Sequence, residues 1–542
     1  MTKRILIVGG VAGGASAAAR LRRLDETAEI IVFDRGPYVS FANCGLPYYV
    51  GDIIRDESKL LVASAEMFRT RFNIDIRTEH EVLSIDRAQR TIQVRDLQRG
   101  TIAAESYDAL ILSPGASAIR PPLPGIDVDG IFSVRTIPDS RRVRQWIDDN
   151  HAQRALVIGG GFIGLEMAEN LAHRGLTITI LEKAGQLMPQ LDPEMAEPVR
   201  RQLAQRGVTV RLSEGVTEFS RSPAGLLATT DRGTQLAADL IILAIGVRPE
   251  VGLARAAGLT IGATGGIAVD ESMRTTDPAI YAVGDAVETV DVVTGMRQVV
   301  PLAGPANRQG RVAAEAICGR GSHFRGMQAT AVCGAFGLTI ASTGASETAL
   351  KRAGISDFEK VYLHPGHHVG YYPGAKPIHL KVLFRRSDGR ILGAQAVGEE
   401  GVEKRIDVIA MALQLGGTVH DLSEAELCYA PQFGAAKDPV NLAGFIAENV
   451  RSGDMPLARR DEGGFVLDVR DPNECKGGMI PGAVNIPLDQ LRLRLAELPT
   501  DRPLNVVCAV GQRAYYAVRI LRQRGFDARH FTGGMQTVTT LG

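Results

Sequence analysis

The chain has 542 residues, which is too long for a single hydrophobic core and predicts several domains. It is 45% hydrophobic, and its 61 basic and 61 acidic residues leave a formal net charge of zero, which disfavours a nucleic acid or a membrane surface as partner. The sequence contains no apolar run of about 18 residues and no visible targeting segment. Its six cysteines are too few for a disulfide framework, so we expect a cytoplasmic protein.

The first predicted unit is a strand, a glycine-rich turn, a helix and a second strand. Residues 4–8 are an apolar run typical of a buried parallel strand, and Gly9-Gly10-Val11-Ala12-Gly13-Gly14 follows them. An alanine-rich helix leads to a strand over residues 30–33 that ends at Asp34. Such a turn lets backbone N–H groups approach a pyrophosphate, and the acid binds ribose hydroxyls. Val11 departs from this pattern, because a glycine is expected at its position.

A single cysteine follows in Ser40-Phe41-Ala42-Asn43-Cys44-Gly45-Leu46-Pro47-Tyr48-Tyr49. Flavin disulfide reductases of the glutathione reductase type carry a second cysteine five residues later, where this chain has Tyr49. A lone thiol cannot close an internal disulfide, so we expect Cys44 to pair with a substrate thiol, a sulfur atom or an oxygen. We also expect a helix N-terminus or a nearby positive charge to lower the pKa of Cys44, because the thiolate is the nucleophile.

A second copy of the dinucleotide unit begins about 150 residues after the first. The strand over residues 155–158 leads into Gly159-Gly160-Gly161-Phe162-Ile163-Gly164, a helix, and a strand over residues 177–181 that ends at Glu182. This copy fits the pattern fully, so the internal repeat predicts two dinucleotide sites. Glutamate favours a free 2′-hydroxyl, so NADH is expected over NADPH, although Lys183 weakens that preference.

Three further segments are similar to parts of flavoproteins that contain two dinucleotide-binding domains. Residues 110–115 and 243–246 each run from a strand to a glycine, Gly115 and Gly246. Residues 276–285 place Asp285 after a strand, as in the segment that binds the ribityl chain of FAD. After about residue 326 the glycine motifs stop, and a hairpin over residues 379–397 and an amphipathic helix through Ile406, Ile409, Ala410 and Leu413 indicate a different domain.

Residues 1–450 resemble the coenzyme A-disulfide reductase branch of the pyridine nucleotide-disulfide oxidoreductases. The Cys44 segment, Gly304-Pro305-Ala306-Asn307-Arg308-Gln309-Gly310 and Gly370-Tyr371-Tyr372-Pro373-Gly374 carry the resemblance. It implies FAD, NADH and coenzyme A as ligands, and a Cys44 that alternates between thiolate and mixed disulfide beside the flavin. It also implies a homodimer in which Tyr371 and Tyr429 reach the active site of the partner subunit.

The resemblance assigns further binding residues. The cofactor set that it implies is Gly9, Gly10, Ala12, Gly13, Asp34, Arg35, Ser113, Gly115, Asp285, Leu302 and Ala303 for FAD, and Gly159, Gly161, Phe162, Ile163, Gly164, Glu182 and Gly246 for NADH. Coenzyme A phosphates favour arginine, and the candidates are Arg20, Arg22, Arg23 and Arg71, with Ser40 and Asn43 at the thiol end. We interpret Cys318, Cys333, Cys428 and Cys475 as ordinary packed cysteines, and no metal site is predicted.

The C-terminal segment resembles rhodanese domains at residues 465–471 and 479–487, except that Met479 stands where the family usually has histidine. Cys508-Ala509-Val510-Gly511-Gln512-Arg513 matches the Cys-x-x-Gly-x-Arg loop of single-domain rhodaneses. A cysteine between a strand and a helix lies in a cradle of backbone N–H groups, which stabilises a thiolate or a persulfide. Cys508 and Arg513 are therefore candidate site residues.

These features predict an α/β protein with two Rossmann-like three-layer domains, an α+β dimerisation domain and a C-terminal rhodanese domain. The predicted boundaries are 1–117 with 248–325 for FAD, 118–247 for NAD(H), 326–450 for dimerisation and 451–542 for rhodanese. The predicted activity is NADH-dependent reduction of coenzyme A persulfide, polysulfide or coenzyme A disulfide through Cys44, with release of hydrosulfide. Cys508 would handle sulfane sulfur.

Two alternatives stay open. An NADH oxidase or peroxidase would cycle Cys44 through a sulfenic acid, but Val11-Ala12-Gly13 lacks the histidine that peroxidase relatives carry in this segment. A sulfurtransferase with a redox-sensing flavoprotein half would depend on Cys508 and tolerate loss of Cys44. The residues do not rank the sulfur substrates.

Overall fold

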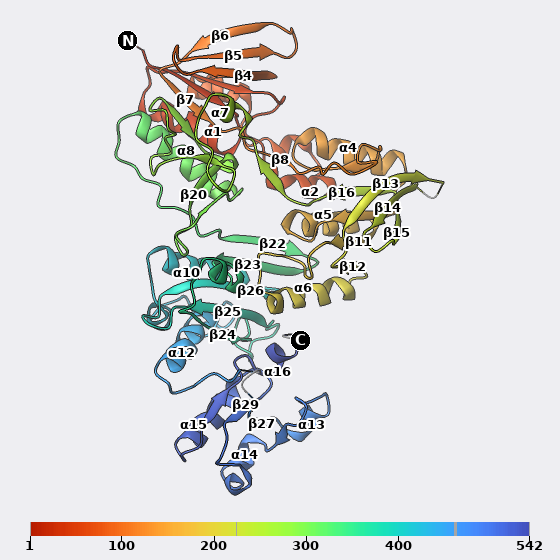
Figure 1. The fold of residues 1–542 in the computed structure, drawn as a ribbon, viewed down its shortest axis with the longest axis vertical. Helices are drawn as coiled ribbons and strands as arrows, with labels where there is room; N and C mark the ends of the chain where they lie inside the picture. Colours follow the sequence, from red (N-terminus) through yellow and green to blue (C-terminus); the bar gives the residue numbers. More distant parts are fainter. Residues whose placement is uncertain (1, 224, 460–462, 541–542) are drawn as a thin grey trace. The chain divides into compact units, whose positions relative to one another are not determined.

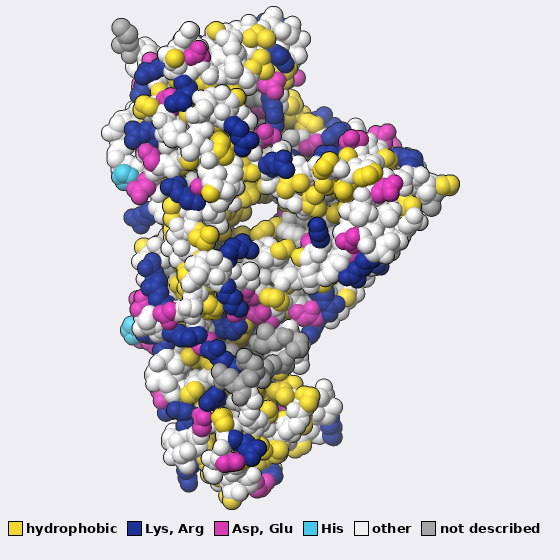
Figure 2. Space-filling view, viewed as in Figure 1, with side chains coloured by type: hydrophobic (Ala, Val, Ile, Leu, Met, Phe, Trp, Pro, Cys, Tyr) yellow, Lys and Arg dark blue, Asp and Glu magenta, His cyan; other side chains and the backbone are white. Residues whose placement is uncertain are grey.

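The computed structural model describes residues 2–223, 225–459 and 463–540, and the chain divides into two compact units (Figure 1). Unit 1 comprises residues 1–185 and 207–329, and unit 2 comprises residues 186–206 and 330–542. Within the described residues, no helix has the length and apolar character needed to cross a membrane. Basic and acidic side chains are intermixed on the face drawn in Figure 2, as expected for a chain with zero net charge.

The first parallel sheet of unit 1 has the strand order β19-β7-β1-β2-β3. Its strands are β1 (Arg4–Val8), β2 (Glu29–Asp34), β3 (Asp75–Thr78), β7 (Ala109–Leu112) and β19 (Ile280–Ala282). Helix α1 (Ala12–Leu24) follows the glycine turn, and α8 (Ala303–Ile317) packs closely on it. The close approach requires glycine, because a Cβ at Gly310 would lie 2.3 Å from the Gly13 carbonyl oxygen.

The second parallel sheet repeats this order as β12-β11-β10-β16-β9. Its strands are β9 (Ile131–Phe132), β10 (Arg154–Ile158), β11 (Thr177–Glu182), β12 (Thr209–Leu212) and β16 (Leu240–Leu243). Each copy inserts a three-stranded antiparallel sheet. In the first copy β4 (His80–Asp86), β5 (Thr91–Asp96) and β6 (Ile102–Ser106) lie between β3 and β7, and in the second copy β13 (Val216–Ser222), β14 (Gly225–Thr230) and β15 (Gln235–Ala238) lie between β12 and β16. The internal repeat is therefore longer than the glycine motifs that predict it.

Shorter elements complete unit 1. The helices are α2 (Leu46–Val50), α3 (Ala65–Phe72), α4 (Ile137–Asp149), α5 (Phe162–His173) and α7 (Gly252–Ala256). The remaining strands are β8 (Ala116–Ala118), β17 (Val247–Pro249), β18 (Ile267–Ala268), β20 (Val287–Val290) and β21 (Arg297–Gln298). Thr136 and Asp139 form a capping box that begins α4.

Unit 2 contains an antiparallel sheet with the order β22-β23-β26-β25-β24. Its strands are β22 (Ala331–Ala335), β23 (Leu338–Gly344), β24 (Glu359–Leu363), β25 (Ile378–Phe384) and β26 (Ile391–Gly398), and its helices are α6 (Pro193–Gln205), α9 (Glu347–Arg352), α10 (Val402–Gln414), α11 (Val419–Ser423) and α12 (Pro439–Arg451). The predicted hairpin is the antiparallel β25–β26 pair. Helix α10 buries its predicted apolar residues against the sheet.

The C-terminal part of unit 2 is a four-stranded parallel sheet with the order β28-β27-β29-β30. Its strands are β27 (Phe465–Asp468), β28 (Val484–Asn485), β29 (Leu504–Val507) and β30 (Ala528–His530), and its helices are α13 (Pro472–Cys475), α14 (Leu488–Leu491), α15 (Gln512–Arg522) and α16 (Gly534–Val538). Two parallel α/β units, an antiparallel α+β layer and a small α/β sheet confirm the predicted fold class.

Candidate functional site

The segment that carries Cys44 is fastened to the first glycine turn. The Ser40 N–H donates to the Gly10 carbonyl at 2.8 Å, and the Ala42 N–H donates to Leu60 at 2.7 Å. Ser40 adopts a left-handed conformation with φ of 48°, which turns the chain sharply at this contact. Cys44 then lies in a single 3-10 turn over Asn43–Gly45 that leads into α2. The glycine turn thus positions the thiol.

Arg135 is the cationic side chain beside this turn. Its Nη2 donates to Asp285 at 2.6 Å, and its Nε donates to the Ala116 carbonyl at 3.0 Å. The Asn43 amide, in the orientation that satisfies both of its polar atoms, donates to the Arg135 carbonyl at 2.7 Å and accepts from Nη1 at 3.1 Å. Arg135 therefore links the cysteine segment to Asp285. It belongs to no motif, so sequence reasoning missed it.

The chain's own groups raise the pKa of Cys44, contrary to our expectation from the sequence. Cys44 is exposed, yet neighbouring protein atoms remove enough water to raise the pKa of its thiol, Glu166 raises it further, and Arg135 opposes both. Glu166 lies on α5 and accepts from the Tyr48 hydroxyl at 3.4 Å. Burial raises the pKa of Glu166 to about 7. The turn that carries Cys44 is too short to supply the expected helix-terminus effect.

Tyr49, which stands where a second cysteine would lie, is the centre of a charged cluster. Its ring is buried, and its hydroxyl donates to Glu57 at 3.2 Å. Arg141 of α4 bonds Glu57 through two nitrogens, at 3.0 and 2.6 Å, and donates to Tyr38 at 2.8 Å. The Arg144 guanidinium, also on α4, lies 4.5 Å from the centroid of the Tyr49 ring. This position therefore fastens α2 to α4.

The two glycine turns bind their acids in the same way. The Gly10 and Gly36 N–H groups each donate to Asp34 at 2.8 Å, and the Gly160 and Ala184 N–H groups each donate to Glu182 at 2.7 Å. These bonds fix each carboxylate and leave further lone pairs for ribose hydroxyls. The residues present therefore fit FAD at the first turn and NADH at the second.

Backbone geometry explains the glycines of both turns. A Cβ at Gly14 would lie 1.9 Å from the Gly9 carbonyl oxygen, and a Cβ at Gly164 would lie 1.9 Å from that of Gly159. The sequence analysis left Gly14 out of the site, although its spacing from Gly9 matches that of Gly164 from Gly159. Val11 is tolerated because its φ is −97°, which needs no glycine.

The other proposed cofactor residues lie at the ends of the same strands and helices. Ser113 and Gly115 follow β7, and Gly246 follows β16 with φ of 105°. Ala12 begins α1, Phe162 and Ile163 begin α5, Leu302 caps α8 and Ala303 begins it. Arg35 is exposed and lies 3.6 Å from Glu250.

The coenzyme A candidates differ in availability. Arg22 is wrong as a phosphate ligand: it is buried and donates to the backbone carbonyls of Asp25, Glu26, Ala28, Phe72 and Asn73. Arg20 forms an ion pair with Glu315, with Nε at 3.0 Å. Arg23 and Arg71 are exposed. Periodicity on α1 could not distinguish the buried arginine from its exposed neighbour.

In unit 2, the structure brings Tyr371 and Tyr429 together. Their hydroxyls lie 2.7 Å apart, and this hydrogen bond raises the pKa of Tyr371. The two side chains are 74% and 46% exposed, which leaves both phenols accessible from outside the chain.

The loop that carries Cys508 is a compact turn at the carboxyl end of β29. Cys508 is buried, and its sulfur accepts from the Gly511 N–H at 3.2 Å. Arg513 bonds Glu474 of α13 through two nitrogens, at 2.6 and 2.7 Å, and holds the pKa of that carboxyl at about 2. Arg513 therefore fastens the loop to α13.

The rhodanese-like part is docked on the antiparallel sheet of unit 2. Thr532 Oγ1 accepts from the Tyr362 N–H at 2.9 Å and donates to its carbonyl at 3.2 Å. His364 Nε2 lies 2.8 Å from Thr537 Oγ1. Met455, which follows the predicted boundary between residues 450 and 451, is buried. These contacts favour a docked arrangement over a swinging one.

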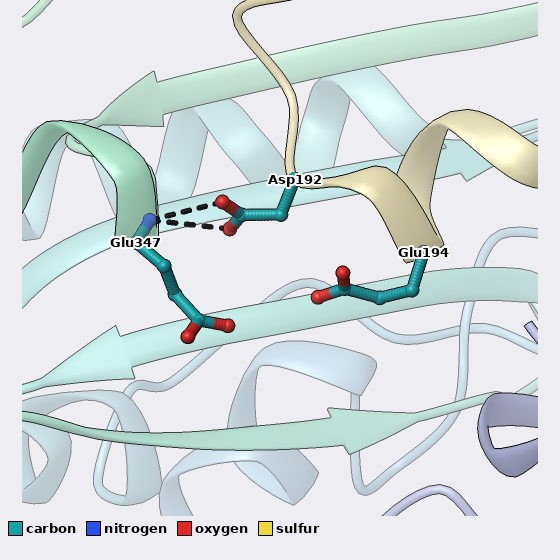
Figure 3. A group of neighbouring side chains, drawn as sticks. All are labelled: Asp192, Glu194 and Glu347. Atoms are coloured by element: carbon teal, nitrogen blue, oxygen red, sulfur yellow. Dashed lines mark hydrogen bonds between the residues drawn. The ribbon is translucent and has the colours of Figure 1, made fainter. Parts of the chain in front are cut away.

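Three neighbouring acidic side chains in unit 2 have the spacing of a metal site (Figure 3). A lysine lies between them. Asp192, Glu194 and Glu347 all contact Lys381 Nζ, with Asp192 at 2.6 Å. The ammonium group of Lys381 occupies the position between the carboxylates that a metal ion would take, and it offsets part of their negative charge. The charges of Lys381 and Lys360 hold the pKa of Glu347 at about 2, against its burial.

Comparisons with known proteins cover most of the chain. Residues 3–310 match the family described as pyridine nucleotide-disulphide oxidoreductase, residues 330–438 match its dimerisation domain, and residues 456–540 match the rhodanese-like domain. The chain is 38% identical over 446 residues to coenzyme A disulfide reductase of Staphylococcus epidermidis, covering 82% of this chain and all of that protein.

Two solved structures match along nearly the whole length. The reduced CoADR-RHD of Bacillus anthracis is 45% identical with a TM-score of 0.98, covering 100% of this chain and 98% of that one. A NAD-dependent persulfide reductase from A. fulgidus is 37% identical with a TM-score of 0.92, covering 98% and 99%.

Proposed function

We propose a function on the premise that this chain belongs to the pyridine nucleotide-disulphide oxidoreductase family. The chain uses FAD and NADH to reduce coenzyme A persulfide, and also polysulfide or coenzyme A disulfide, through Cys44. It releases hydrosulfide from the persulfide. Relatives named as a coenzyme A disulfide reductase and a persulfide reductase support this substrate class.

The observation that carries the proposal is the absence of a second cysteine beside Cys44. The position five residues on is taken by the buried Tyr49, bonded to Glu57. Cys44 is exposed, so a thiol from outside can reach it. A substrate sulfur therefore fills the role that an internal cysteine has in the glutathione reductase type.

The chemistry at Cys44 balances with a persulfide substrate. The Cys44 thiolate attacks the inner sulfur of CoA–S–SH, the S–S bond breaks, and HS⁻ leaves a Cys44–S–S–CoA mixed disulfide. Two electrons and one proton then return the Cys44 thiolate and free CoA–SH. Bound FAD supplies those two electrons from NADH. Arg135 favours the thiolate at both stages, because its charge opposes the effects that raise the pKa of Cys44.

The proton that converts the released coenzyme A thiolate to CoA–SH comes, in this proposal, from the tyrosine pair of a partner subunit in a homodimer. The match to a dimerisation domain over residues 330–438 supports the dimer. Tyr371 and Tyr429 are exposed and share a hydrogen bond, so one phenol can donate to a leaving thiolate while the other stabilises it. Arg23 and Arg71 are the exposed candidates for the coenzyme A phosphates. Six cysteines that form no disulfide within the described residues support a reducing compartment, the cytoplasm.

Cys508 supplies sulfane sulfur to this chemistry. Its thiolate takes the outer sulfur from a donor R–S–SH, giving Cys508–S–SH and R–S⁻. The Gly511 N–H, 3.2 Å from the Cys508 sulfur, stabilises the anionic forms. Cys44 and Cys508 belong to different proposed domains of the same chain. This covalent link raises their effective concentration for a shared thiol carrier.

Steady-state assays of the holoenzyme test the proposal. NADH oxidation and hydrosulfide release are measured with coenzyme A persulfide, coenzyme A disulfide, glutathione persulfide, polysulfide and peroxide, for the wild type, Cys44→Ser and Cys508→Ser. We expect Cys44→Ser to stop all NADH-driven hydrosulfide release, and Cys508→Ser to impair only substrates that need sulfur transfer. Faster turnover of peroxide than of any persulfide would overturn the proposal, as would an active Cys44→Ser variant.

A further inference from the structure

His530 lies behind the Cys508 loop and is almost fully buried, with 3% of its surface exposed. Its Nε2 is 2.8 Å from the Gly511 carbonyl oxygen. A carbonyl only accepts, so Nε2 carries the hydrogen and Nδ1 of the neutral ring does not. Burial lowers the pKa of His530 to about 4, which keeps the ring neutral at physiological pH.

The other ring nitrogen of His530 has no hydrogen-bond partner among the described residues. Nδ1 is buried and unbonded, which is an unfavourable arrangement for an acceptor. An apolar side chain of similar size would fill this space without that cost. The feature that distinguishes histidine from an apolar side chain at this position is its one donor group, the Nε2–H that bonds the Gly511 carbonyl.

Gly511 joins that donor to the cysteine. Its N–H donates to the Cys508 sulfur, and its φ of 100° lies in a region that favours glycine. The ring packs against it, since a Cβ at Gly511 would lie 3.3 Å from His530 Cε1. Glycine has wide backbone freedom, so the direction of the Gly511 N–H depends on how the residue is held. The Gly511 carbonyl accepts from the Tyr515 N–H of α15 at 3.0 Å and from the His530 Nε2–H at 2.8 Å, and His530 is the side chain that restrains it.

The rest of the loop is held independently. The Cys508 carbonyl accepts from the Met535 N–H at 2.8 Å, and the Ala509 carbonyl accepts from the Gln536 N–H at 3.1 Å, both in α16. The His530 backbone is itself fixed, because its N–H donates to Pro456 at 2.8 Å and its carbonyl accepts from Ala458 at 2.9 Å. His530 is therefore a rigid support for the second half of the loop, as α16 is for the first.

We propose that His530 is a positioning residue for the Cys508 sulfur site, holding the Gly511 carbonyl so that the Gly511 N–H stays directed at the cysteine sulfur. The inference deepens the proposed function, because it rests on Cys508 accepting sulfane sulfur from small thiol-bound donors. The hydrogen bond of the His530 ring is to the Gly511 carbonyl, so His530 acts on the sulfur through one glycine.

Three variants of the holoenzyme test this. His530→Met keeps the volume and removes the donor, whereas His530→Gln retains a donor near the position of Nε2. Asn505→Leu is the matched control: Asn505 is also buried and donates to a carbonyl, that of Gly463, in the strand that precedes the loop. The readout is the pH profile of Cys508 alkylation, followed by mass spectrometry of its peptide. The pH at the midpoint of this profile reports thiolate formation at Cys508. The plateau rate at high pH also reports how well the alkylating reagent reaches the sulfur.

We expect the midpoint to rise by about one pH unit in His530→Met, a tenfold loss of thiolate near neutrality, as for loss of one hydrogen bond to a charged group. His530→Gln and Asn505→Leu should stay near the wild-type midpoint. Thermal unfolding of His530→Met should change little, since the unbonded Nδ1 disappears together with the donor. An unchanged midpoint in His530→Met, or a His530→Gln variant that behaves like it, would overturn the inference.

A second readout separates this inference from the proposed function. Sulfur transfer from glutathione persulfide to cyanide should fall about tenfold in His530→Met and recover in His530→Gln. NADH oxidation with coenzyme A disulfide, which needs only Cys44, should be unchanged in all three variants. A wild-type protein that transfers no sulfur would contradict the role of Cys508, while the alkylation midpoints would still decide the role of His530.

Discussion

Replacing Glu166 by glutamine should make Cys44 more reactive, and the gain should depend on pH. Glu166 is one of the groups that raise the pKa of the Cys44 thiol, and its own pKa is about 7. A neighbouring charge typically shifts a pKa by about one unit, a factor of ten in thiolate. Since Glu166 is charged in about half of the molecules at pH 7, the expected gain is roughly twofold there, about eightfold at pH 8.5 and negligible at pH 5.5.

The assay is the rate of Cys44 alkylation in the reduced holoenzyme, measured for the wild type and Glu166→Gln across that pH range. Arg135→Met should change the rate in the opposite direction, because Arg135 lowers the pKa of Cys44. Flavin content must be measured for Arg135→Met, since Arg135 also bonds Asp285. A Glu166→Gln to wild-type ratio that does not vary with pH would refute the reasoning.

Three further changes have expected outcomes. Gly14→Ala should lower the flavin-to-protein ratio, because the new Cβ would lie 1.9 Å from the Gly9 carbonyl oxygen. Gly321→Ala is the control and should keep its FAD, because a Cβ there would have no atom within 4 Å. Equal flavin content in the two variants would contradict this account of the turn. Lys381→Met should cost roughly 3–5 kcal/mol in urea unfolding, because the buried Asp192 and Glu194 and the partly buried Glu347 lose their shared ammonium partner. Lys351→Met removes an exposed lysine 3.8 Å from Glu347 and should change little, and equal costs would argue against a buried ionic centre. The lowered pKa of Glu347, about 2, means that its stabilisation is complete above its usual value of 4.5 and is lost as pH falls toward 2, and Lys381→Met should weaken that dependence. Tyr49→Phe should lower the free energy of unfolding by about 1–2 kcal/mol in thermal unfolding, because it removes the hydrogen bond to Glu57. Tyr516→Phe, at an exposed tyrosine, is the control. An unchanged stability of Tyr49→Phe would mean that the cluster does not fasten α2 to α4.

Much of the fold follows from local sequence patterns. Apolar runs that end in glycine predicted β1 and β10, and the acids that follow β2 and β11 predicted the dinucleotide turns, because these features lie close together in sequence. The antiparallel insertions β4–β6 and β13–β15 were not predicted. Strands β6 and β13 contain few buried residues and show no regular alternation, whereas β5 and β14 do alternate, a signal that the sequence analysis left unused.

The candidate site was harder to predict where it depends on contacts between distant residues. Arg22 and Arg23 are adjacent in sequence, and only packing shows that the first is buried against five carbonyls while the second is exposed. Arg135 reaches Asp285 from 150 positions away. The pKa of Cys44 was predicted in the wrong direction because burial and Glu166, neither visible in the motif, outweigh Arg135. His530 likewise reaches the Cys508 loop only through folding.

The central claim is that a substrate thiol completes the disulfide that Cys44 cannot form within the chain. Intact-protein mass spectrometry after treatment of the reduced holoenzyme with coenzyme A persulfide, without NADH, tests this most directly. The account predicts one coenzyme A per chain, bound at Cys44, released as free coenzyme A when NADH is added, and absent from Cys44→Ser. A Cys44 that carries only oxygen, or an adduct that NADH does not release, would contradict it.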